Sequence, residues 1–255
     1  MPVRATASGS GAPVRRYEEI DSTNAEALRL AMMGEPAPFW VSARVQTAGR
    51  GRSGRSWTSS PGNLIASLAI ELETDARKAY QLSLVTGVAV AEAVASALPA
   101  EAAKNLRLKW PNDILIGSAN AGGILVESAA RPGRGGLVGA IGIGLNLVDH
   151  PRGLGRDATH LAAHGWTSSP EEMLLSLDVA LGRWLANWNE GAGFGQVREA
   201  WLERGGMLGE RVSVNAGSTL ICGTYCGLDE DGALLLSDED GTIRRIHFGD
   251  VSLAG

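Results

Sequence analysis

The chain contains 255 residues, of which 44% are hydrophobic and 20% are charged, with a formal net charge of −5. This composition is typical of a globular protein with one large domain, or one domain with a small appendage. The acidic balance excludes a general electrostatic attraction to nucleic acid, so any phosphate binding must be local.

The N-terminal residues are small and polar, and no stretch approaches 18 uncharged apolar residues. We therefore expect a cytoplasmic protein with no membrane partner and a disordered tail over residues 1–12. This tail is too short for a helix-turn-helix, so neither a DNA-binding module nor a nucleic-acid partner is expected in this chain. Cys222 and Cys226 form no disulfide framework, and we expect both to pack inside a C-terminal module.

A strand is expected over residues 14–20 and a short helix over residues 23–33. Thr23 and Glu26 have the spacing of a capping box, and Gly34 follows the last apolar residue of the helix. Capping alone can explain the polar residues at this helix start, Ser22, Thr23 and Asn24. The same groups can also face a polar ligand, so both roles stay open.

Next comes a Gly/Arg loop, residues 49–57, between the expected strands 39–46 and 64–72. Its glycines alternate with arginines, and an aromatic residue ends it, in the sequence Gly49-Arg50-Gly51-Arg52-Ser53-Gly54-Arg55-Ser56-Trp57. Glycines let such a loop move, and guanidinium groups suit phosphate oxygens. An isolated segment of this kind is more often a solvated surface loop, whereas Trp57 at its end favours stacking on a nucleobase.

The middle of the chain alternates between a buried helix and further strands. The helix is expected over residues 80–98, and the strands over residues 106–110, 113–116, 122–127 and 137–148. Pro111 turns the chain within the segment Lys109-Trp110-Pro111-Asn112-Asp113. Glycines within the last two strands indicate close approach of a neighbour or a ligand. Glu127 is expected only to mark where its strand reaches solvent.

The C-terminal quarter changes character. Amphipathic helices are expected over residues 170–189 and 195–204, and Gly205-Gly206 has the composition of a linker. From residue 210 onward, four short strands separated by tight turns predict a small β-barrel, with strands over 211–214, 219–228, 233–237 and 242–248.

Taken together and in this order, five segments resemble the biotin protein ligase family, in the form without a DNA-binding domain. They are Ser22-Thr23-Asn24, the stretch from Gln46 to Trp57, Lys109 to Asp113, Gly122 to Glu127 and Gly142 to Asn146. The resemblance implies an α+β fold: a mixed β-sheet with packed helices, similar to class II aminoacyl-tRNA synthetases, plus a C-terminal SH3-like β-barrel. It implies a catalytic domain over residues 13–206 and an SH3-like domain over residues 207–255.

The resemblance also assigns roles to matching positions. Biotin would be bound by Ser22, Thr23, Asn24, Gln46, Gly49, Gly123 and Gly142. ATP and the adenylate would be bound by Arg50, Arg52, Arg55, Trp57, Asn112 and Asn146. Catalytic roles would fall to Arg50, Arg52, Lys109 and the residue at position 120, and Asp113 would handle Mg²⁺.

The implied reaction uses ATP, Mg²⁺ and biotin. The biotin carboxylate attacks the α-phosphorus of ATP, and a lysine of a biotin carboxyl carrier protein then takes the biotinyl group. The carrier domain of acetyl-CoA carboxylase, or of a similar carboxylase, is the expected partner. Either a monomer or a homodimer would be compatible with the sequence.

One position departs from the family pattern. The family usually carries a lysine three residues before the glycine of its Gly-Ile-Leu strand, where this chain has Asn120. An asparagine donates hydrogen bonds without a charge. Three explanations of Asn120 remain open: a slow ligase, an arginine that substitutes in space, or an altered chain. Two alternative functions also remain: a non-catalytic biotin or biotinyl-adenylate binder, and a lipoate-type ligase.

Overall fold

The computed structural model describes residues 11–73, 78, 80–131, 136–153, 157–205, 208–217 and 219–253. Most expected helices and strands are present, with ends that differ by a few residues. The elements of the first two thirds are β1 Val14–Ile20, α1 Thr23–Met32, β2 Phe39–Gln46, η1 Arg52–Gly54, β3 Leu64–Leu72, α3 Gln81–Ala97, α4 Ala100–Ala103, β4 Leu106–Lys109, β5 Asp113–Ile116, β6 Ala119–Ala130 and β7 Leu137–Leu145. The remaining elements are η2 Leu161–His164, α5 Pro170–Trp188, η3 Asn189–Gly191, α6 Phe194–Arg204, β8 Arg211–Ala216, β9 Thr219–Leu228, β10 Leu234–Ser237, β11 Ile243–Ile246 and β12 Asp250–Leu253.

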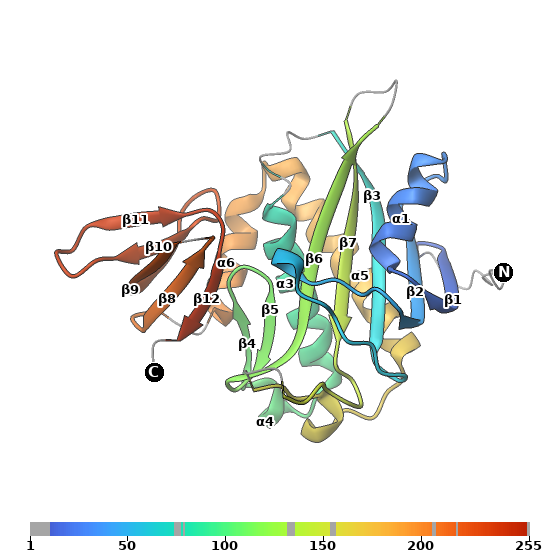
Figure 1. The fold of residues 1–255 in the computed structure, drawn as a ribbon, viewed down its shortest axis with the longest axis horizontal. Coiled ribbons are helices and arrows are strands. Elements are labelled where there is room, and N and C mark those ends of the chain that lie inside the picture. The colour runs from blue at the N-terminus through green and yellow to red at the C-terminus, as the bar shows by residue number, and fades with distance from the viewer. Residues whose placement is uncertain are drawn as a thin grey trace.

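The body of the molecule is a seven-stranded mixed sheet in the order β1-β2-β3-β7-β6-β5-β4. Only β1 and β2 run parallel, and the other neighbouring pairs are antiparallel. Helices α3, α5 and α6 cover the rear face in Figure 1, whereas α1 and residues 49–57 lie on the front face. The front face is therefore open for a site between α1 and the loop.

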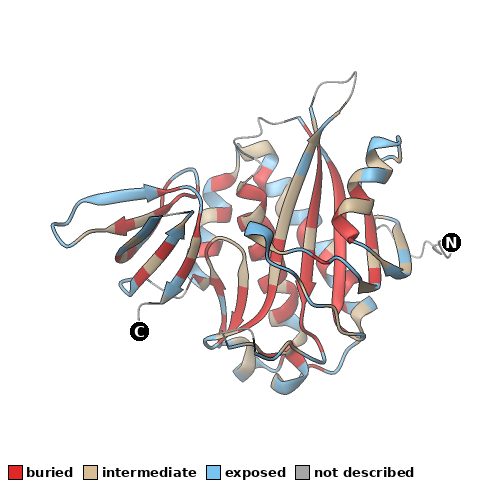
Figure 2. Ribbon diagram, in the orientation of Figure 1, coloured by how far each residue is buried: buried red, intermediate tan, exposed pale blue. Residues whose placement is uncertain are grey.

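Successive side chains along the central strands point alternately to the two faces of the sheet and pack into a separate core on each face. On β2, Trp40 packs into the large core with α3 and α5, whereas Phe39 and Val41 pack with Ala27 of α1. Such alternation is the period of a strand covered on both sides. Figure 2 shows the buried residues gathered in the central strands and in α3. Helix α3 lies between the sheet and the other rear helices, which explains its nearly continuous apolar sequence.

The C-terminal module is a five-stranded antiparallel sheet in the order β11-β10-β9-β8-β12. It is joined to the body by side-chain hydrogen bonds to its backbone. Trp110 Nε1 donates to the carbonyl oxygen of Gly232 at 3.1 Å, and Arg198 Nε donates to that of Leu228 at 2.9 Å. These bonds hold the module beside α6 and beside the edge of the large sheet that β4 forms (Figure 1).

The structure corrects several expectations. Strand β6 continues three residues beyond Glu127, and a fifth short strand, β12, follows the four that were expected in the module. Cys222 and Cys226 are both exposed free thiols rather than packed side chains, because they alternate with the buried residues of β9. Of the expected tail, residues 1–10 lie outside the described residues, as do residues 206 and 207 at the expected domain boundary.

Candidate active site

A central pocket of about 400 Å³ opens on the front face of the sheet. It lies between the N-terminus of α1, the Gly/Arg loop and strands β6 and β7. Most of the expected ligand-binding residues meet on its wall: Ser22, Thr23, Asn24, Gln46, Arg50, Arg52, Arg55, Trp57, Asn112, Asp113, Gly123 and Gly142. Apolar side chains complete the lining, namely Ile65, Ile124, Leu125 and Ile143.

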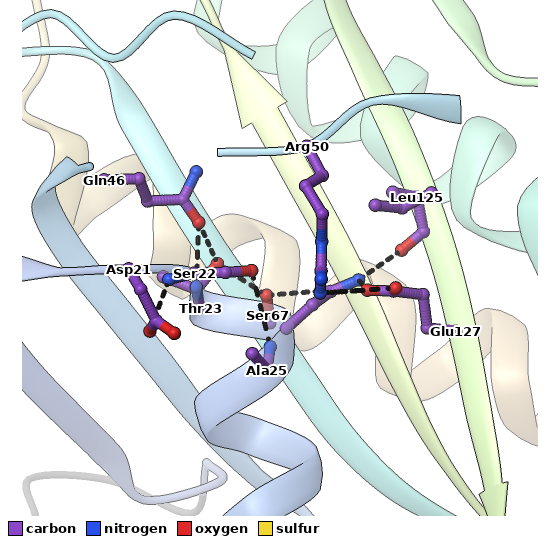
Figure 3. Close-up of polar contacts among 10 residues, drawn as sticks. Asp21, Ser22, Thr23, Ala25, Gln46, Arg50, Ser67, Leu125 and Glu127 are labelled. Carbon is purple, nitrogen blue, oxygen red and sulfur yellow. Dashed lines mark hydrogen bonds and ion pairs between the residues drawn. The ribbon is translucent and has the colours of Figure 1, made fainter. Parts of the chain in front are cut away.

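One end of the pocket is a fixed polar floor. Gln46 Oε1 accepts hydrogen bonds from the backbone N–H of Thr23 at 2.8 Å and from its hydroxyl at 3.0 Å, as Figure 3 shows. The hydroxyl of Ser67, on β3, lies 2.7 Å from Thr23 Oγ1 and 2.6 Å from Asn24 Oδ1. Ser22 meanwhile caps α1 by accepting from the backbone N–H of Ala25. Capping and a wall position in the pocket are thus compatible for Ser22, whereas the capping box expected from Thr23 and Glu26 does not form, because Thr23 bonds Gln46 and Glu26 accepts from Arg29.

Two glycines of β7 let other groups approach the sheet closely. A Cβ atom at Gly142 would lie 2.4 Å from Asn24 Oδ1, and one at Gly144 would lie 2.4 Å from the indole of Trp57. Any larger residue would therefore displace Asn24 or Trp57. On the neighbouring strand, a Cβ atom at Gly123 would lie 3.5 Å from the Trp57 indole, an ordinary van der Waals distance, so the close approach is at Gly142 and Gly144. The expectation that strand glycines mark close approach of a neighbour is confirmed at these two positions.

The Gly/Arg loop is held over the pocket by ion pairs. Arg50 Nη2 lies 3.3 Å from Glu127 Oε1, and Arg55 Nη2 lies 2.7 Å from Asp250 Oδ1 (Figure 3 shows the first pair). Arg52 donates to Asn112 Oδ1 at 3.2 Å and to the backbone carbonyl of Gly249 at 3.3 Å. The loop therefore connects the large sheet to strand β12 of the C-terminal module.

Burial lowers the pKa of the Arg52 guanidinium, while the nearby Asp250 carboxylate acts in the opposite direction. An arginine remains charged even so. Arg52 thus brings a positive charge that is partly removed from water, where its attraction for an anion is stronger than at the surface.

Four of the expected site residues lie off the pocket wall: Gly49, Lys109, Asn120 and Asn146. The Gly49 carbonyl closes the base of the loop by accepting from the N–H of Trp57 at 2.9 Å. Lys109 Nζ lies 2.7 Å from Asp113 Oδ2, so it acts on the pocket through that carboxylate. Asn146 is buried and donates to the carbonyl oxygen of Thr159 at 3.0 Å.

Asn120 is buried, yet the backbone places it on the same face of the sheet as the pocket. Ile114 pairs with Gly122, whereas Leu115 pairs with Asn120, so β6 contains one additional residue at a bulge. Because residues paired across a ladder share a face, Asn120 lies on the face that carries Gly123. The segment 157–159 runs beside it: the N–H of Asn120 donates to the carbonyl of Asp157, and the carbonyl of Asn120 accepts from the N–H of Thr159.

Glu127 corrects the expectation of a solvent-facing strand end. Its Oε2 accepts from Asn24 Nδ2 at 2.8 Å, and its other oxygen is paired with Arg50. It therefore joins the polar floor to the loop. Sequence reasoning also missed Ser67 and Asp250. A serine within an apolar strand is the one local signal for Ser67, and no local signal links Asp250 to a loop nearly 200 positions earlier.

Asp113 contributes one carboxylate to the pocket. Within the described residues, no three His, Cys, Asp or Glu side chains gather closely enough to hold a metal ion. A protein that receives Mg²⁺ together with nucleotide phosphates needs only one or two carboxylates, so the donor set fits a metal that arrives with its substrate.

A family model described as "Biotin/lipoate A/B protein ligase family" matches residues 17–146, and one described as "Biotin protein ligase C terminal domain" matches residues 207–254. The chain belongs to the biotin/lipoate A/B protein ligase family, and its C-terminal module is the SH3-like domain of the biotin protein ligases.

Individual relatives agree with this assignment. A biotin–[acetyl-CoA-carboxylase] ligase of Paracoccus denitrificans is 39% identical over 227 residues, covering 87% of this chain and 92% of the relative. A ligase of the same name from Mycobacterium tuberculosis is 31% identical over 256 residues, covering 95% and 91%. The biotin protein ligase of Aquifex aeolicus in complex with biotin and ATP superposes with a TM-score of 0.76 and 28% identity, covering 94% of this chain and 98% of that one.

Proposed function

We propose that the protein activates biotin with MgATP to biotinyl-5′-AMP and then transfers the biotinyl group to a lysine of a biotin carboxyl carrier domain. The observation that carries this proposal is the meeting of the polar floor and the Gly/Arg loop in one pocket. The two curated ligases described above act, by their names, on acetyl-CoA carboxylase. A carboxylase is therefore the carrier that we propose here.

The polar floor suits the ureido ring of biotin. That ring has two N–H donors and one carbonyl acceptor, which cannot be buried without partners. Hydroxyl and carboxamide groups of Ser22, Thr23 and Gln46 offer both kinds of partner, and Ser67 lies within hydrogen-bond distance of the Thr23 hydroxyl, which in turn donates to Gln46. Asn24 and the strand glycines Gly123 and Gly142 would flank the bicyclic ring and its side chain.

In the first step, a biotin carboxylate oxygen forms a bond to the α-phosphorus of ATP, and the bond from that phosphorus to pyrophosphate breaks. No nucleophile from the protein is required. Arg50 and Arg52 would neutralise the charge that builds up between the two anions. Asp113, with Lys109 beside it, would hold the Mg²⁺ that accompanies the phosphates, while Trp57 would contact the adenine.

In the second step, the neutral amine of the acceptor lysine forms a bond to the acyl carbon, and the bond from that carbon to AMP breaks. The lysine proton leaves with solvent, and AMP is released. A loop closed over the mixed anhydride would keep water from hydrolysing it first. The arginines of the loop, including Arg55, would thus retain the adenylate after it forms, in addition to stabilising the charge during its formation.

The same proposal includes a domain boundary between residues 206 and 207, a monomeric or homodimeric state, and a cytoplasmic location. None of the helices in the described part of the chain is long and apolar enough to span a membrane. The hydrogen bond from the Trp110 indole N–H to the backbone carbonyl of Gly232 supports two modules that work as one unit.

Mass spectrometry of the protein mixed with biotin, MgATP and a carrier domain tests the proposal. We expect the carrier to gain the mass of one biotinyl group. Adenylate that stays on the protein without transfer would support a binding protein instead. A mass gain with lipoate in place of biotin would assign the chain to the lipoate-type ligases.

Ser67→Ala is expected to weaken biotin binding. The substitution removes a fully buried hydroxyl that lies within hydrogen-bond distance of Thr23 Oγ1 and Asn24 Oδ1 and can donate to one of them, a loss of about 1 to 2 kcal/mol, or roughly 5- to 30-fold in Kd. Titration calorimetry with biotin alone measures the effect. Ser42→Ala is the matched control, because Ser42 donates to the carbonyl of Ile65 from the neighbouring strand outside the pocket wall. Equal affinities for both variants would contradict the role of Ser67.

A further inference from the structure

A second cavity of about 520 Å³ adjoins the central pocket along the Gly/Arg loop. We name it the side groove. Arg50, Gly51, Arg52 and Leu125 line both cavities. Across the groove from the loop lie Asn215 near the end of β8, Gly217 just beyond it, and Phe248 and Gly249 between β11 and β12. The groove is therefore formed jointly by the body and the C-terminal module.

The groove lies where an acceptor protein has to approach. A lysine side chain reaches about 6 Å from its Cα atom to its amine, so the chain that carries it must come to the surface directly beside the pocket. The Gly/Arg loop covers the pocket itself. A concave surface that shares four residues with the pocket lies within the required reach.

The charged residues that line the groove are two arginines, Arg50 and Arg52, and one carboxylate, Glu127. Glu127 lines the groove, and its carboxylate is partly exposed. In the structure it is paired with Arg50, whose side chain is half exposed. An adenylate that draws Arg50 towards its phosphate would leave the Glu127 charge without its arginine partner, while Glu127 Oε2 keeps the hydrogen bond from Asn24. The carboxylate can then attract the ammonium of an incoming lysine.

Phe248 provides an apolar anchor at the same place. This side chain is 64% exposed, although it is large and aromatic. Exposed aromatic side chains beside a cavity are typical of the small clusters that dominate binding energy at protein interfaces. Phe248 lies two positions before Asp250 in the chain. Asp250 in turn forms ion pairs with Arg52 and Arg55 of the loop.

From these observations we infer that the side groove is the docking site for the lysine-bearing segment of the carrier domain, with Phe248 as its apolar contact and Glu127 as the group that receives the lysine ammonium. This inference rests on the proposed ligase function. It adds the surface on which the acceptor is recognised, and it gives the C-terminal module a direct part in choosing the carrier.

Phe248→Ala tests the inference with two readouts on the full chain. Pyrophosphate release from biotin and MgATP without carrier reports adenylation, and biotin transfer at varied carrier concentration reports docking. We expect the KM for the carrier to rise about tenfold, with kcat at saturating carrier and the adenylation rate changed less than twofold. Phe248→Leu keeps most of the apolar area and should stay within threefold of the unchanged protein.

Ile243→Ala is the matched control. Ile243 is also a large exposed apolar residue of the C-terminal module, but it begins β11, at the opposite edge of the sheet from β12. It should leave both readouts unchanged. Since retained adenylation proves that a variant is folded, loss of transfer alone cannot be attributed to misfolding.

The outcomes separate the inference from the proposed function. If the unchanged protein neither releases pyrophosphate nor modifies the carrier, the ligase function fails. If it modifies the carrier and Phe248→Ala has the same KM, only the docking site is wrong. Equal losses of adenylation and transfer would move Phe248 to the nucleotide site and overturn the inference. Dissociation of a dimer by Phe248→Ala in sedimentation would assign the groove to a second copy of the chain and overturn it as well.

Discussion

Arg52→Ala should release biotinyl-5′-AMP on the order of 100-fold faster while changing the Kd of biotin by less than about threefold. In the structure, Arg52 is the loop arginine that contacts both modules, through Asn112 and the backbone of Gly249. Its charge is partly withdrawn from water and faces the pocket. In the proposed binding mode, biotin alone would place its ureido ring at the opposite, polar end of the pocket, so its affinity should depend little on Arg52.

The measurement is a chase of radiolabelled adenylate with excess unlabelled biotin, combined with calorimetry for biotin alone. Arg44→Ala is a suitable control, because Arg44 is an exposed arginine on β2 whose partner is the equally exposed Glu18. That variant should retain the adenylate as the unchanged protein does. Equal losses of adenylate and biotin binding in Arg52→Ala would show that the loop does not act as a lid over the intermediate.

Asn120→Lys should raise the rate of adenylation at least tenfold. The family pattern has a lysine at this position, and a missing charge-assisted contact costs about 2 to 4 kcal/mol in such sites. The bulge in β6 turns position 120 to the face of the sheet that carries the pocket. A lysine there has a flexible stem long enough to extend along this face towards Gly123.

Pyrophosphate release under saturating biotin and MgATP measures the gain. Asn120→Met has a comparably long side chain without the charge and should bring no increase. Because position 120 is buried, thermal unfolding of each variant shows whether the site tolerates the change. A folded Asn120→Lys protein with an unchanged rate would mean that the assignment of Asn120 to the reacting groups is wrong.

The sequence predicts the local elements of this fold well. Strands β2 and β3 begin and end where expected, since long runs of apolar and β-branched residues end at polar or glycine-rich segments. Strand β12, Asp250–Leu253, was missed because it closely follows the expected strand 242–248 and pairs with the distant strand β8. The exposure of Cys222 and Cys226 depends on which face of β9 meets the core, and that is decided by tertiary packing.

The site is harder to predict, because its connections join distant parts of the chain. Motifs in the sequence identify the α1 N-terminus, the loop and the Asn112-Asp113 turn, and the structure brings these together. Ser67, Glu127 and Asp250 have no motif of their own. Each acts by contact with a residue more than 40 positions away, which only the folded sheet and the docked C-terminal module bring about.

The ion pairs around the pocket have a consequence for how an anion binds. Arg50 is paired with Glu127, Arg52 and Arg55 with Asp250, and Lys109 with Asp113. An incoming phosphate therefore exchanges places with a carboxylate that the protein already holds, instead of displacing dissolved counterions. Mobile salt competes weakly with partners fixed at such short range. Binding of the adenylate should accordingly depend little on ionic strength. The selectivity of the site for its anion would then be set by the geometry of the paired side chains.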